Sequence, residues 1–83
     1  MIESKQQLLD QFRDKADAFL SDPGLMTGID FDDAAVTLKR YVLTELRDQQ
    51  LASKLAQFPK LIRRLDVTTL TALVAEVEGK LLD

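Results

Sequence analysis

Residues 30–46 read DFDDAAVTLKRYVLTEL, and apolar residues recur in this segment at spacings of three and four. That period is typical of an α-helix that buries one face. The apolar residues of this main face are Phe31, Ala34, Ala35, Leu38, Tyr41, Val42 and Leu46. Val36 and Leu43 fall outside the main face, so the apolar arc of the helix exceeds about 180°. We predict a helix that opens at Asp30 or Asp32 and is either central to a bundle or partly uncovered for a partner.

A first helix is predicted before this segment, from Ser4 to Leu20. Its apolar stripe consists of Leu8, Leu9, Phe12, Ala16, Phe19 and Leu20. Ser4 and Gln7 have the spacing of a capping box, in which each side chain satisfies a free backbone donor. The segment 21–28, SDPGLMTG, contains Pro and two Gly and predicts the break before the next helix.

Two further helical regions follow. The stripe of the first region is Leu51, Leu55, Phe58, Ile62 and Leu65. Pro59 interrupts it, which favours two short helices that meet near Phe58, with one kinked helix as the alternative. The last helix begins after a cap at Asp66 and runs toward Leu81. Its stripe is Leu70, Leu73, Val74, Val77 and Leu81.

The fold class that follows is all-α, as a compact antiparallel bundle of four or five short helices in one domain spanning 1–83. The chain has 83 residues, of which 46% are hydrophobic and 30% charged, a composition typical of a globular domain. No apolar run is long enough to span a membrane. The N-terminal residues show no signal peptide, so we expect a cytoplasmic protein.

The residue types that most enzymes use are missing. The chain contains no His and no Cys, which excludes thiol nucleophiles, imidazole acid–base chemistry and the usual zinc sites. Asp30, Asp32 and Asp33 invite comparison with a calcium-binding loop, but Ala34 and Ala35 stand where such a loop needs a ligand and a glycine. No phosphate-binding glycine motif is present. We therefore expect a non-catalytic protein with no metal, cofactor or small-molecule substrate.

Charge is segregated along the chain, although the net charge is only −3. Residues 14–33 hold six acids against one Lys, a net of −5, whereas residues 38–64 hold seven bases against two acids, a net of +5. Such segregation can steer a partner of complementary charge. The alternative is that these charges pair within the bundle or are simply solvated.

Two surfaces are predicted as candidates for binding. The first is a protein-binding surface on the second helix, made of Val36, Leu43, Arg40 and Arg47. Val36 and Leu43 are instead core residues if the bundle covers both sides of this helix, and they form a dimer seam if a second copy covers one. The function expected from this surface is protein–protein interaction, as an adaptor, inhibitor, small chaperone or regulatory subunit.

The second candidate is a basic face made of Lys60, Arg63 and Arg64. Their spacing of three and four puts these side chains on one side of a helix, where they can contact nucleic-acid phosphates. The acidic composition of the whole chain, with a pI near 4.8, argues against this alternative. A nucleic-acid-associated regulator is therefore the second functional hypothesis.

Overall fold

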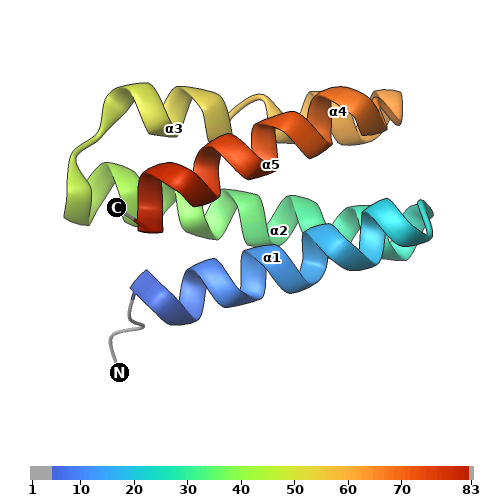
Figure 1. Ribbon diagram of the computed structural model, residues 1–83, viewed down its shortest axis with the longest axis horizontal. Helices are drawn as coiled ribbons and strands as arrows, with labels where there is room; N and C mark the ends of the chain where they lie inside the picture. Colours follow the sequence, from blue (N-terminus) through green and yellow to red (C-terminus); the bar gives the residue numbers. More distant parts are fainter. Residues whose placement is uncertain (1–4, 83) are drawn as a thin grey trace.

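The first two helices form an antiparallel hairpin (Figure 1). The structure is a computed structural model that describes residues 5–82. Helix α1 spans Lys5–Ser21 and helix α2 spans Leu25–Tyr41, so the break between them covers only residues 22–24. The capping box predicted at Ser4 lies outside the described residues.

Helix α2 starts earlier than the sequence predicted. Gly24 is its N-cap residue, and the Gly28 amide already donates the first helical hydrogen bond to the Gly24 carbonyl oxygen at 2.9 Å. The Thr27 hydroxyl donates to the carbonyl oxygens of Gly24 and Asp22, which tethers the first turn to the preceding loop. Residues 25–28 are therefore helical, although Gly28 indicated a loop in the sequence.

This earlier start changes the place of the aspartates. Asp30, Asp32 and Asp33 lie in the second and third turns of α2, so the prediction that Asp30 or Asp32 opens this helix is wrong. No side chain caps the start of α2, whose N-cap residue is Gly24.

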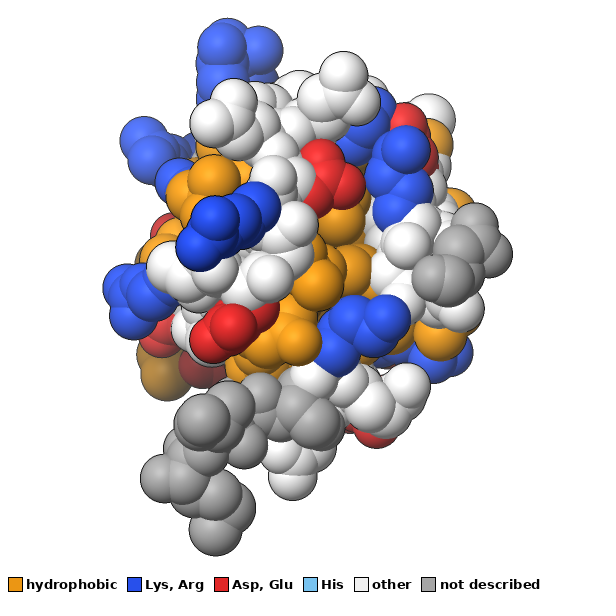
Figure 2. Space-filling view, turned by 90° about the vertical axis from the view of Figure 1, so that its left-hand side faces the viewer, with side chains coloured by type: hydrophobic (Ala, Val, Ile, Leu, Met, Phe, Trp, Pro, Cys, Tyr) orange, Lys and Arg blue, Asp and Glu red, His pale blue; other side chains and the backbone are white. Residues whose placement is uncertain are grey.

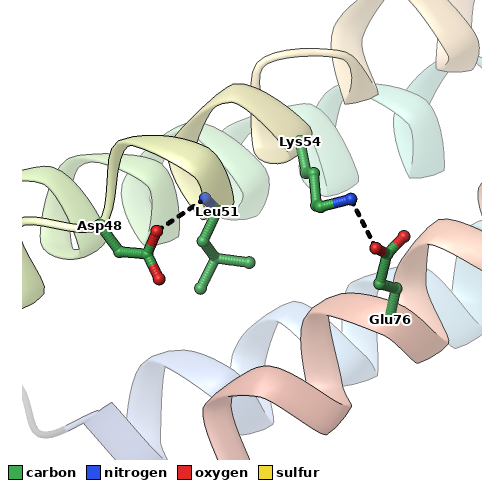
Figure 3. Close-up of polar contacts among 4 residues, drawn as sticks. All are labelled: Asp48, Leu51, Lys54 and Glu76. Atoms are coloured by element: carbon green, nitrogen blue, oxygen red, sulfur yellow. Dashed lines mark hydrogen bonds and ion pairs between the residues drawn. The ribbon is translucent and has the colours of Figure 1, made fainter.

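A short π-helix, η1, continues α2 over Val42–Leu46. It ends at Arg47, whose backbone is left-handed with φ of 53°. Helix α3 then spans Gln49–Leu55, and the Asp48 side chain caps it by accepting a hydrogen bond from the Leu51 amide at 3.0 Å (Figure 3). An aspartate in this position satisfies a backbone donor that the helix leaves free.

The third helical region is broken in two, as the sequence favoured. Helix α4 spans Phe58–Arg64, with Pro59 in its first turn, where the missing amide hydrogen costs no helical bond. The alternative of one kinked helix is therefore wrong. Helix α5 spans Val67–Leu82, and Asp66 caps it by accepting a hydrogen bond from the Thr69 amide at 3.2 Å.

The predicted fold class is confirmed: residues 5–82 form a compact all-α globule of four packed helices, counting α3 and α4 as one broken helix, with no strand in that range (Figure 1). Helices α3 and α4 follow one another along one side of the molecule, and both pack against α2 and α5. Helix α5 also packs against α1, which closes the bundle around one core.

The core of the bundle is purely apolar among the described residues. Its centre is a group of four buried phenylalanines, one each from α2 and α4 and two from α1: Phe12, Phe19, Phe31 and Phe58. The Phe31 ring centroid lies 5.5 to 5.7 Å from those of the other three rings. The predicted stripes of α1 and α5 are also confirmed as core residues, Leu20 being partly buried.

Two apolar residues predicted to be buried are exposed instead. Leu46 is 41% exposed, because the wider π-helical turn of η1 shifts the phase of the main face at its last residue. Leu65 is 58% exposed, because it is the left-handed residue that ends α4 and the chain turns away there from the core.

Candidate protein-interaction surface

The structure places the residues predicted to bind a partner on the surface. Val36 and Leu43 are 40% and 41% exposed, and Arg40 and Arg47 are also exposed. The interpretation of Val36 and Leu43 as core residues of the bundle is therefore wrong. Arg47 lies beyond the end of η1 with a left-handed backbone, so it does not continue the helical surface of the other three.

These residues belong to a longer row on α2 that faces away from the core, which we call the outward stripe. It consists of Met26, Ile29, Asp33, Val36, Arg40 and Leu43, all of them exposed. Spacings alternate between three and four, as in a helix that pairs with another helix. The buried residues of α2 and the start of η1 form a separate row, Gly28, Phe31, Ala35, Leu38 and Val42. Helix α2 therefore has two apolar rows, of which the bundle covers one.

Sequence reasoning missed the first turns of this stripe. Met26 and Ile29 are 69% and 46% exposed, yet both fell outside the predicted helix. The signal was the spacing of three and four continued backward from Val36, which was not followed because Gly28 indicated a loop.

A groove of about 470 Å³ lies beside the stripe, between α2 and α4. Leu25, Ile29 and Asp32 line it from α2, and the buried Phe19 and Gly28 also contribute. From the other side it is lined by Pro59, Ile62, Arg63 and Leu65. The lining is mostly apolar with an acid on one wall and a base on the other, which is typical of a site that orients what it binds.

Asp32 is incompletely satisfied in this wall. Its Oδ1 oxygen is buried and accepts no hydrogen bond from the described residues. Arg63 lines the same groove without forming an ion pair to it. Buried carboxylate oxygens are normally hydrogen-bonded, so this oxygen is an exception among the described residues.

Two helix ends have a left-handed residue that carries a side chain, one at the end of η1 and one at the end of α4. Among residues 5–82, the non-glycine residues with positive φ are Arg47 and Leu65, at 53° and 56°. The left-handed conformation is costly for a residue with a Cβ, and glycine usually occupies it at a helix end. Leu65 is exposed, its left-handed backbone is unfavourable for a leucine, and its side chain lines the groove. Such strain is consistent with a residue kept for contact with a partner.

Figure 2 looks at the end of the molecule where η1 lies. Hydrophobic side chains gather in the middle of this face, and basic side chains with a few acidic ones stand around them. Leu43 and Leu46 of η1 are exposed large apolar residues.

The basic face is also solvent-exposed. Lys60, Arg63 and Arg64 are all exposed on α4. Residues 5–82 hold two ion pairs, Arg13 with Glu78 and Lys54 with Glu76, and Figure 3 shows the second of them. Among residues 5–82, ion pairing therefore neutralises only Lys54 of the bases in the segment 38–64.

Residues 5–82 contain neither a metal-binding cluster nor a membrane-spanning helix. No group of three or more potential metal-ligating side chains gathers among residues 5–82. None of the helices in this range is long and apolar enough to cross a membrane. No protein-family model, curated protein or solved structure matches the chain.

Proposed function

We propose that this chain is a non-catalytic protein-interaction domain that binds another protein through the outward stripe of α2. One observation carries this proposal: Met26, Ile29, Val36 and Leu43 lie exposed in a single helical row on a helix whose other apolar row is fully covered. Scattered exposed apolar residues are ordinary in a soluble protein, but four of them aligned in one row with helix-pairing spacing are a feature of interaction surfaces.

The adjoining groove supports the same function. Its volume of about 470 Å³ is enough for an apolar side chain from a bound partner, and its polar walls can fix the direction of approach. Ile29 belongs to both the stripe and the groove, so one bound segment can contact both.

A Val36→Asp variant tests this function. An acid at the middle of the stripe would lose its water on binding, which is unfavourable for a charged group. We therefore expect the binding free energy to weaken by about 2 kcal/mol or more, which is a loss of affinity of more than tenfold. The matched control is Ala72→Asp, which adds the same charge at an exposed position of α5, a helix with no substantial contact to α2. Tagged proteins are incubated with lysate, and the captured proteins are compared.

We expect proteins captured by the wild-type chain and by Ala72→Asp to be missing from Val36→Asp. Circular dichroism and thermal unfolding should show that both variants remain folded, because both sites are exposed. Equal capture by Val36→Asp and the wild-type chain would contradict the proposed function.

A second candidate function is nucleic-acid binding through the basic face. It is favoured by one observation, that Lys60, Arg63 and Arg64 are exposed together without ion pairs to the described residues. The expected result is binding of duplex DNA at about 50 mM salt, with the Arg63→Ala/Arg64→Ala variant binding more weakly and its log–log salt slope reduced by about 2. A mobility-shift titration over a salt series measures both quantities. Absence of any shift at low salt excludes this function.

A further inference from the structure

The outward stripe carries its acid, Asp33, before its base, Arg40, so two stripes that run antiparallel bring the acid of one near the base of the other. The stripe pairs off around a midpoint between Ala34 and Ala35. The pairs equidistant from it are Met26 with Leu43, Ile29 with Arg40, and Asp33 with Val36. An apolar residue therefore stands at each end of the pair. Arg40 of the reversed helix lies opposite Ile29, which is one helical turn from Asp33.

We propose that a second copy of this chain docks on the outward stripe, with its α2 antiparallel to the first. This deepens the proposed function, on which it rests, by naming the occupant of the stripe. In such a two-fold arrangement every contact is made twice. Met26 meets Leu43 of the second copy, and Arg40 of the second copy enters between Ile29 and Asp33, as a side chain does when two helices interlock.

The flank of the stripe carries a second charge pair. Asp32 and Lys39 lie one residue before Asp33 and Arg40, and neither forms an ion pair with a described residue. In antiparallel helix pairs, such flanking positions face each other across the seam. Asp32 then lies opposite Lys39 of the second copy, which brings opposite charges together across the seam.

Charge also decides the orientation. Helix α2 has its acids, Asp30, Asp32 and Asp33, toward the N-terminus and its bases, Lys39 and Arg40, toward the C-terminus. A parallel pair would put acids beside acids and bases beside bases, which is unfavourable across an interface. The antiparallel pair places the opposite charges together on both sides of the two-fold axis.

The size of the seam predicts a reversible dimer. From Met26 to Leu43 the stripe is about 26 Å long at 1.5 Å per residue, and the longest dimension of the Cα positions is 31 Å. The seam therefore runs along most of the molecule but is only one helix wide. An interface of this kind falls at the small end of specific contacts, so dimerisation should depend on concentration.

Analytical ultracentrifugation of four proteins tests the proposal. These are the wild-type chain, Arg40→Asp, Asp33→Arg, and the double variant in which the two residues are exchanged. Between about 10 μM and about 1 mM the wild-type mass should rise from 9.4 kDa toward twice that value. Each single variant places like charges together twice and should weaken the dimer at least about tenfold. The exchange restores opposite charges and should recover wild-type dimerisation within about threefold.

Each other outcome overturns the proposal. A wild-type chain that stays monomeric at about 1 mM has no second copy on the stripe. If the single variants dimerise as well as the wild-type chain, the dimer contact lies elsewhere. If the double variant does not recover wild-type dimerisation, the antiparallel pairing is excluded. The proposed function is tested separately: if the wild-type chain is monomeric but Val36→Asp still loses a captured protein, the stripe binds a different protein and only the dimer is excluded.

Discussion

Phe31→Ala is expected to lower the free energy of unfolding by about 4 kcal/mol. The Phe31 side chain is completely buried on α2, and its ring packs against Phe12 and Phe19 of α1 and Phe58 of α4. Removing it leaves a cavity where three helices meet, and the surrounding rings cannot close it without losing their own contacts.

This loss is large for so small a chain. At about 0.05 to 0.15 kcal/mol per residue, a domain of this length has roughly 4 to 12 kcal/mol of stability in total. Urea unfolding followed by circular dichroism measures the change. Phe31→Leu is the control, because it keeps much of the volume and should cost about 1 to 2 kcal/mol. A loss below about 1 kcal/mol for Phe31→Ala would show that the four rings are not the centre of the core.

Gly28→Leu is expected to destabilise the fold by about 3 kcal/mol, the second largest effect. A Cβ atom at Gly28 would lie 3.3 Å from Ile62 Cγ2 and 3.3 Å from Phe19 Cε1, so these neighbours would have to move by a few tenths of an ångström. A leucine overpacks this close approach of α2 to α1 and α4.

Gly79→Leu provides the matched control for this prediction. Gly79 lies near the end of α5, and a Cβ there meets no atom within 4 Å. Leucine has a higher helix propensity than glycine, so this variant should gain up to about 0.8 kcal/mol. The two melting temperatures should therefore shift in opposite directions. A shift of both variants in the same direction would contradict the close approach at Gly28.

The sequence predicted those elements whose local pattern and tertiary packing agree. Helices α1 and α5 have one apolar stripe each, and the structure buries both. Pro59 separates α3 from α4 because its ring is accommodated only in a first turn. The start of α2 was missed because Gly28 has two meanings, a loop residue by propensity and a close-packing residue by its contacts. Only the positions of α1 and α4 decide between these meanings.

The same ambiguity limited prediction of the candidate site. Val36, Arg40 and Leu43 were found because they lie within the segment predicted as a helix, where Val36 and Leu43 widen the apolar arc beyond the main face, whereas Met26 and Ile29 were lost with the first turns of α2. The groove depends on the approach of α4 to α2, which no local pattern specifies. The positive φ of Leu65 is likewise a consequence of how α4 ends, so its exposure could not be anticipated from its place in an apolar stripe.

The central claim is that the outward stripe of α2 is a protein-binding surface that a second copy can occupy. The most direct measurement is a dilution series followed by two-dimensional ¹H–¹⁵N NMR, from about 1 mM to about 10 μM, because this range covers weak association. We expect chemical shifts that change with concentration, with the largest changes at the backbone amides between Met26 and Leu43. Shifts that are absent, or that gather on α4 or α5 instead, would contradict this claim.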